Sequence, residues 1–128
     1  ILNGGITDIE AIQEHLKTFD GAMIGREAYS NPYFLADIER DVFGNKDISD
    51  RDEIAKQMAI YAQEQFEQHQ TPVKSITRHI LGLYHHQPGA KAWKRYLSEN
   101  AHLEGAGPEV IEQAIKARRE AADEQRAA

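Results

Sequence analysis

Two pairs of residues near the start of the chain have the types and positions that bind phosphate. Asn3-Gly4-Gly5 follows a short apolar run, and Gly25-Arg26 follows a second one about 20 residues later, the length of one β-α repeat. Glycine lets the backbone turn tightly and present N–H groups to an anion, and arginine adds a positive charge. An arginine at the surface that pairs with Glu27 or Asp8 is the alternative interpretation of Arg26. Together the two pairs favour a phosphate site built from two successive loops.

A second set of candidate residues is basic and lies in a stretch of chain without acidic side chains. Between Glu67 and Glu99 there is no aspartate or glutamate, while the rest of the chain carries 10 basic and 21 acidic residues. A basic surface binds the phosphates of nucleic acid by releasing counterions. The alternatives to nucleic-acid binding are a solvated face or a surface for an acidic protein partner. The basic residues are Lys74 and Arg78 on one predicted helix and Lys91, Lys94 and Arg95 on the next.

The residues around the phosphate motif predict alternating strands and helices. Thr7-x-x-Glu10 has the form of a capping box, and the short apolar run 22–24 between glycines is typical of a buried parallel strand. Apolar residues at helical spacing within 33–42 predict the next helix. The order is β-α-β-α. Loops after two successive strands fit the phosphate site that (β/α)8 barrels form after strands 7 and 8.

Beyond a polar turn the pattern becomes helical only. We place a domain boundary at residue 45, so that residues 1–45 are the end of a TIM barrel and residues 46–128 are helical. Four amphipathic helices joined by short turns predict a four-helix bundle, and the fold class is mainly α. The alanine-rich, charged tail from about Ala117 is expected to fray. The predicted helix starts are Asp50, Thr71, Pro88 and Gly107.

Composition excludes several classes of protein and of site. The 128 residues are 41% hydrophobic and 28% charged, with a net charge of −6, as in an ordinary globular domain. No apolar stretch approaches the roughly 18 residues of a membrane helix, so no membrane span is expected. The chain has no cysteine, which removes disulfides, thiolate metal sites and cysteine nucleophiles. No other metal-ligand spacing and no catalytic arrangement is visible, so we expect neither a metal nor a catalytic residue here.

Four stretches of the sequence resemble the C-terminal part of the tRNA-dihydrouridine synthases, most closely the A subfamily. The resemblance covers nearly the whole chain up to the tail, and its last two stretches are much more specific than the first two. The chain opens on an apolar pair that runs into a glycine turn, as at the end of a strand, so we expect a C-terminal fragment of a longer protein. The stretches are Asn3-Gly4-Gly5-Ile6, 25–33 (Gly-Arg-Glu-Ala-Tyr with Asn-Pro-Tyr), 78–83 (Arg-His-Ile-Leu-Gly-Leu) and 88–98 (Pro-Gly-Ala-Lys-Ala-Trp-Lys-Arg-Tyr-Leu-Ser).

The resemblance implies an FMN-dependent, NADPH-using oxidoreductase of the cytoplasm that reduces D-loop uridines 20 and 20a of tRNA to dihydrouridine. In the family the FMN barrel performs the chemistry and a helical bundle holds the tRNA. By match to the motif, Asn3-Gly4-Gly5 and Gly25-Arg26 would hold the FMN phosphate. Lys91 and Lys94 fall at bundle positions that contact tRNA, where the family often has arginine. That departure keeps the charge and loses the planar fork of arginine.

The resemblance also sets limits on what these residues do alone. The family's proton donor is a cysteine upstream in the barrel, so we expect the fragment to be inactive and to need the N-terminal barrel as its partner. Weak or no FMN binding is expected in isolation, because a quarter of a barrel leaves strand edges unpaired. Two alternatives remain. In the first, the chain is part of another FMN barrel oxidoreductase that acts on a small molecule. In the second, it is a helical module for protein interaction.

Overall fold

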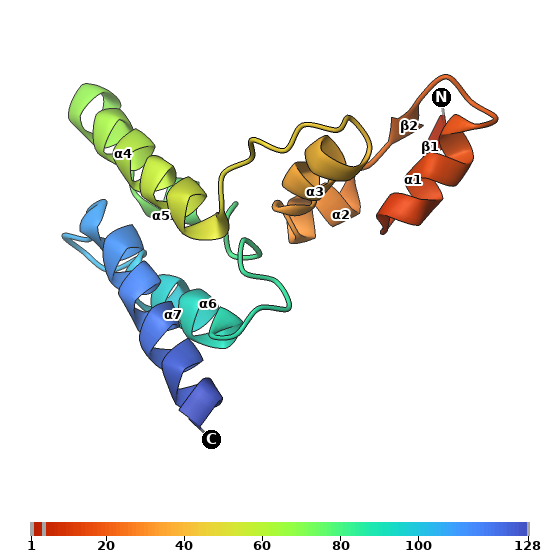
Figure 1. The fold of residues 1–128 in the computed structure, drawn as a ribbon. Helices are drawn as coiled ribbons and strands as arrows, with labels where there is room; N and C mark the ends of the chain where they lie inside the picture. The colour runs from red at the N-terminus through yellow and green to blue at the C-terminus, as the bar shows by residue number, and fades with distance from the viewer. Residues whose placement is uncertain (1, 4, 128) are drawn as a thin grey trace. The chain divides into compact units, whose positions relative to one another are not determined.

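The computed structural model describes residues 2, 3 and 5–127, and the chain divides into two compact units. Unit 1 comprises residues 1–49 and unit 2 comprises residues 50–128. The division falls slightly beyond the turn at which the sequence predicts a boundary. Both units are mainly helical (Figure 1). None of the helices in the described part of the chain combines the length and the apolar character needed to cross a lipid bilayer.

Unit 1 contains a two-stranded parallel sheet, with helices after each strand. Leu2 lies opposite Ala22, and Asn3 lies opposite Met23. The β-α-β order and the parallel pairing were expected from the sequence. A short helix after the second strand was not. The elements are β1 (Leu2–Asn3), α1 (Ile9–Leu16), β2 (Ala22–Met23), α2 (Arg26–Ser30) and α3 (Phe34–Asp41).

A small apolar core holds unit 1 together. Its buried residues are Ile6, Ile12 and Phe34. Two local predictions for this unit are wrong. Helix α1 is capped by Asp8, whose Oδ1 accepts a hydrogen bond from the Ala11 amide at 2.7 Å, so the predicted cap at Thr7 is wrong. The extended backbone of the aspartate aims its carboxylate at the first turn. Strand β2 is not buried as predicted, because Met23 is 48% exposed and borders a pocket.

Unit 2 is built from three long helices and one helical turn. They are α4 (Arg51–His69), α5 (Lys74–Thr77), α6 (Ala90–Asn100) and α7 (Glu109–Ala127). Asp50 caps α4 as predicted, since its Oδ1 accepts a hydrogen bond from the Glu53 amide at 2.8 Å. The side of α4 that is buried is a stripe of alanines, Ala55, Ala59 and Ala62. These small side chains let α7 pack closely on α4. Helix α7 also packs along α6 (Figure 1).

The second predicted helix is wrong in extent, and the four-helix bundle is therefore not confirmed. After the single turn of α5, residues 78–89 form a series of turns. Their carbonyl groups bind side chains from elsewhere: the Trp93 indole donates to Ile80 O at 2.9 Å, and Arg51 Nε donates to Leu83 O at 3.0 Å. The apolar residues that carried the helical pattern, Ile80, Leu83 and Tyr84, are nevertheless buried.

The predicted fraying of the C-terminal tail is also wrong. Helix α7 continues to Ala127, and Ala122 in its last third is 2% exposed. Beyond Ala117 the helix contacts the rest of unit 2 through Arg118, Arg119 and Gln125. These contacts, described below, fix a segment whose composition alone predicts a solvated end.

Candidate functional site

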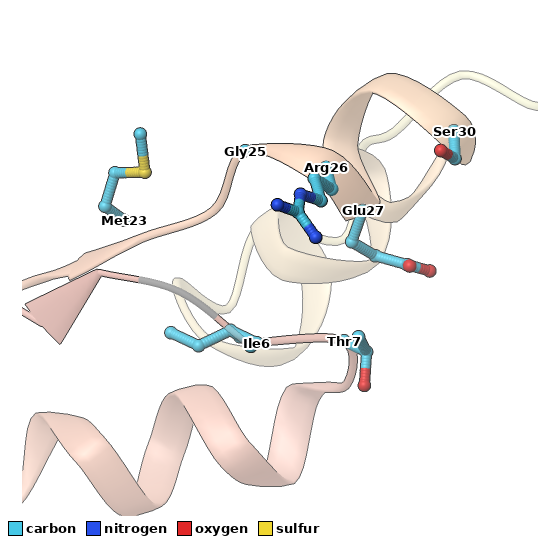
Figure 2. A pocket seen from close by; sticks show the side chains of 8 residues that line it. Ile6, Thr7, Met23, Gly25, Arg26, Glu27 and Ser30 are labelled. Atoms are coloured by element: carbon cyan, nitrogen blue, oxygen red, sulfur yellow. The ribbon is translucent and has the colours of Figure 1, made fainter.

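A pocket of about 630 Å³ in unit 1 lies beyond the ends of β1 and β2 (Figure 2). One side comes from the loop after β1, and the other comes from the loop after β2 and the start of α2. The two predicted phosphate loops therefore face the same space. The lining residues are Gly5, Ile6, Thr7, Met23, Gly25, Arg26, Glu27 and Ser30.

The two glycines leave the backbone of the pocket open. Gly5 has φ of +70°, in the left-handed region that side chains rarely adopt, and a Cβ built on it would meet no atom within 4 Å. A Cβ on Gly25 would meet only the Met23 side chain, at 3.8 Å. Both glycines therefore leave their backbone open toward the pocket, and the left-handed turn at Gly5 favours glycine there.

Arg26 is available to a ligand. Figure 2 shows its guanidinium extending over the pocket between the two loops. The alternative partners are engaged elsewhere: Asp8 caps α1, and Glu27 Oε1 accepts a hydrogen bond from Asn31 Nδ2 at 3.5 Å. Within residues 2, 3 and 5–127, Arg26 makes no hydrogen bond or ion pair. An exposed guanidinium beside open glycine backbone can bind a phosphate or another anion.

The remaining two residues of the predicted phosphate motif are placed less completely. Asn3 ends β1, and its backbone pairs with Met23 next to the pocket. Gly4 lies outside the described residues. The structure thus brings Gly5, Gly25 and Arg26 together, as the spacing of the motif predicts.

Unit 2 carries the basic residues on α5 and α6. Lys91, Lys94 and Arg95 are exposed along one face of α6, while Trp93 and Leu97 on the other face are buried. Lys74 and Arg78 are exposed at the two ends of α5. We call these five residues the basic surface.

The basic surface is almost free of partners inside the protein. Arg78 Nε donates to His79 Nε2 at 3.2 Å, and the other four side chains make no hydrogen bond or ion pair with any described residue. A hollow of about 140 Å³ is lined by Lys74, Arg78 and Ser98, among others. Ser98 follows Lys94 and Arg95 on the same face of α6, at helical spacings of four and three residues. The hollow therefore connects the two groups of basic residues.

Unit 2 contains a network of charged side chains that the sequence did not predict. Asp52 on α4 accepts hydrogen bonds from the Tyr84 hydroxyl, from Arg119 Nη2 at 3.0 Å and Nε at 3.2 Å, and from Arg118 Nη2 at 3.4 Å. Burial opposes ionisation of Asp52, but the hydrogen bonds from Tyr84 and Arg119 and the two positive charges outweigh it and lower its pKa. Burial and the hydrogen bond to Asp52 raise the pKa of Tyr84, against the opposing charge of Arg118.

The same network holds the turn that leads into α6. Arg118 places its guanidinium 4.5 Å from the centre of the Tyr84 ring and donates to Pro88 O at 3.2 Å. Gln125 Oε1 accepts a hydrogen bond from the Gly89 amide at 3.1 Å. Tyr84 also packs edge-on against Trp93, with ring centres 4.8 Å apart. The contacts join residues far apart in the chain, and the sequence signal was limited to an arginine pair in the alanine-rich tail.

The described residues contain no cluster of histidine, aspartate or glutamate that could hold a metal ion. No carboxylate lies among the residues that line the hollow at Lys74 and Arg78. What the two candidate sites share is the capacity to bind negatively charged groups.

Comparison with known sequences gives one family. Residues 1–121 match the profile of the family described as Dihydrouridine synthase (Dus). The chain is 44% identical over 115 residues to the tRNA-dihydrouridine(20/20a) synthase of Vibrio cholerae, covering 89% of this chain and 35% of that protein. Proteins of the same name from Salmonella typhi and Escherichia coli K12 are 49% and 48% identical over 116 residues, or 90% of this chain, covering 35% and 33% of their own lengths. The chain thus spans about a third of the length of these relatives.

Proposed function

The chain belongs to the dihydrouridine synthase family, and from this premise we propose that it acts as part of a tRNA-dihydrouridine synthase. In this proposal the enzyme reduces uridines 20 and 20a of tRNA in the cytoplasm, the basic surface binds the tRNA, and the glycine-lined pocket binds the phosphate of FMN. The observation that carries the tRNA assignment is the set of exposed cations on α6, namely Lys91, Lys94 and Arg95, none of which pairs with a described residue.

The contrast between two groups of cations supports this assignment. Arg118 and Arg119 are bound to Asp52 and serve the fold. The cations of α6 have no such role, and they project from a helix whose other face is anchored by fully buried Trp93. Because the helix is already packed and these cations are unpaired, binding phosphate requires no ordering of the backbone and breaks no ion pair with a described residue. This is the arrangement expected of a surface that positions a nucleic acid.

The pocket of unit 1 fits one end of FMN. Open backbone at Gly5 and Gly25 and the unpaired guanidinium of Arg26 suit a dianionic phosphate. When bound, FMN supplies hydride transfer to the C5–C6 bond of uridine, with NADPH as the source of electrons. In the proposal Arg26 neutralises the phosphate and the two loops orient the cofactor, and no residue of this chain has a catalytic role.

We further assign β1 and β2 to an FMN-binding (β/α)8 barrel whose remaining strands would pair with them. Unit 1 has a parallel strand pair and, among its described residues, a core built on Ile6, Ile12 and Phe34, and it leaves large apolar side chains exposed. Tyr29, Leu35 and Phe43 are 60%, 55% and 71% exposed. Further barrel strands and helices would cover such side chains. On this account the 128 residues alone do not reduce tRNA.

A binding experiment tests the FMN assignment without requiring activity. Titration with FMN, riboflavin and inorganic phosphate, followed by NMR, should shift the amides of Gly5, Gly25 and Arg26 with FMN and phosphate, at millimolar concentrations. Riboflavin lacks the phosphate and should leave them unchanged, as should FMN with the Arg26→Ala variant. Equal shifts with riboflavin and FMN, or FMN shifts that persist in the Arg26→Ala variant, would contradict a phosphate site in this pocket.

Titration with unmodified tRNA tests the nucleic-acid assignment. We expect binding that weakens steeply between low and physiological salt, because each phosphate contact releases counterions. An acidic protein should compete poorly with tRNA for this surface. Absence of binding at low salt, with the helices intact by circular dichroism, would favour a flavoenzyme acting on a small molecule or a module for protein interaction.

A further inference from the structure

A second hollow in unit 2 adjoins the basic surface and has a different chemistry. It has a volume of about 350 Å³, within the range of roughly 300–1,000 Å³ that is usual for small-ligand sites. It shares Lys74, Ala101 and His102 with the hollow at Arg78, so the two form one groove. We call the groove formed by these two hollows the α5 groove. The residues of its second part are Phe66, Gln70, Pro72, Val73, Lys74, Ala101, His102, Leu103, Gly105 and Ala106.

The α5 groove combines an exposed aromatic ring with cations and lacks acidic side chains. Phe66, at the end of α4, is 45% exposed, and Leu103, from the loop between α6 and α7, is 52% exposed. Lys74 stands between this apolar part and Arg78. Neither part of the groove is lined by aspartate or glutamate, although the chain as a whole is acidic.

This combination is the chemistry that binds an unstacked nucleotide. A nucleobase stacks on an aromatic ring, and the phosphates on either side of it bind lysine or arginine. A duplex presents phosphates but keeps its base faces stacked, so it would use the cations and leave Phe66 without a role. An acidic peptide would likewise satisfy Lys74 and Arg78 without requiring a flat ring.

We propose that the α5 groove binds one unpaired nucleotide of the tRNA, with its base against Phe66 and its phosphates on Lys74 and Arg78. The proposal rests on the function proposed above and adds a site that is separate from the cations of α6. It gives the enzyme a means of recognising a looped-out base other than the one that is reduced, and so of fixing the register of the tRNA.

Variants of Phe66 test the proposal. The chain is titrated with unmodified tRNA at several salt concentrations. Phe66→Ala should weaken binding roughly 5- to 140-fold, the effect of losing one stacked base, and should leave the salt dependence unchanged because no phosphate contact is lost. Phe66→Tyr should retain the wild-type affinity. Lys74→Ala should instead reduce the slope of log K against log salt by about 1.

Tyr61 provides the matched control. It lies on the same helix and is 47% exposed, but it does not line the groove. Tyr61→Ala should therefore bind tRNA like the wild type. If Phe66→Ala is too unstable to test, Leu103→Asp places a repelling charge in the groove from another segment and should weaken binding as well.

The outcomes separate this proposal from the proposed function. If Phe66→Ala or Leu103→Asp is folded and binds tRNA as tightly as Tyr61→Ala, the nucleotide site is wrong while tRNA binding by α6 stands. If a blunt-ended RNA duplex with no unpaired base competes as well as a single-stranded oligonucleotide, the groove does not bind a base. If the wild-type chain binds no RNA, both proposals fail.

Discussion

Asp52 is the residue of unit 2 on which hydrogen bonds from three side chains converge. Its carboxylate accepts from Tyr84, Arg118 and Arg119, and its side chain is 25% exposed. Hydrogen bonds to a charged group contribute about 1.5–3 kcal/mol each when both partners are shielded from water, and less where a partner is exposed as Arg119 is. The residue therefore matters to the fold even though it faces neither candidate site.

Asp52→Asn should lower the free energy of unfolding of the chain by about 1–3 kcal/mol at pH 7. The substitution keeps the shape and removes the charge that Arg118 and Arg119 need. Urea unfolding followed by circular dichroism measures the change. Asp47→Asn is the matched control, because Asp47 is exposed and its side chain makes no hydrogen bond or ion pair with a described residue. A loss no larger than that of the control would contradict the role given to Asp52.

The pH dependence of stability should follow from the same residue. The pKa of Asp52 is lowered in the folded protein, so its contribution is present above the unfolded value of about 3.9 and is lost as the pH falls through the folded value. The difference in stability between wild type and Asp52→Asn should therefore shrink as the pH falls below about 4. Urea titrations between pH 2.5 and 7 measure it, and a difference that stays constant would count against the lowered pKa.

At the scale of the elements, the close approach of α6 and α7 depends on one glycine. Gly89 precedes α6 with φ of +82°, and a Cβ on it would lie 2.3 Å from the carbonyl oxygen of Arg118 on α7. No side chain fits there unless the start of α6 moves away from α7 at Arg118. Gly105 has nearly the same backbone angle, φ of +81°, but a Cβ on it would meet nothing within 4 Å.

Gly89→Ala should therefore cost well over 2 kcal/mol of unfolding free energy, and Gly105→Ala about 1 kcal/mol. The second variant carries the backbone strain alone, so the difference between the two reports the clash with α7. Thermal and urea unfolding give both values. Equal losses would mean that α7 yields readily at Arg118, against the packing described above.

Hydrogen exchange tests the C-terminal half of α7. Because Arg118, Ala122 and Gln125 contact the rest of unit 2, amides of α7 from Ala117 to Ala122 should exchange as slowly as those of α6. Exchange measured by NMR or mass spectrometry distinguishes this from a frayed end. If amides in this segment exchange as fast as those of an unfolded peptide, the tail is frayed, as its composition predicts.

The elements differ in how far sequence predicted them, and the difference follows from the range of the contacts. The cap of α4 at Asp50 depends on residues three apart, and the parallel strand pair lies within one short β-α-β repeat, so both were predictable. The turns after α5 and the ordered tail depend on partners distant in the chain, such as Trp93 bonding to Ile80 O and Arg118 bonding to Asp52. A helical period in 73–84 and an alanine-rich tail carried no sign of these partners.

The candidate sites follow the same rule. Gly5, Gly25 and Arg26 were predictable as neighbours, because successive parallel strands end at the same edge of a sheet. The exposed cations of α6 were predictable from helical spacing against Trp93. The α5 groove was not, because Phe66 and Leu103 meet Lys74 only through the packing of three segments.

At the scale of the whole molecule, charge is segregated. The chain has a net charge of −6, yet the segment between Glu67 and Glu99 contains five basic residues and no acidic one. The acidic remainder repels nucleic acid, so the basic surface would be the place where tRNA approaches. In the function that we propose, this surface binds tRNA as part of a dihydrouridine synthase.

The most direct test is tRNA titration of a double charge reversal, Lys91→Glu with Lys94→Glu, next to Lys56→Glu with Lys116→Glu. The control pair is exposed on α4 and α7, lies outside the basic surface and changes the net charge by the same amount. We predict that the α6 variant loses tRNA binding at physiological salt and that its slope of log K against log salt falls by about 2, while the control binds nearly as the wild type does. Equal loss in both variants, or none in the first, would contradict a tRNA-binding surface on α6.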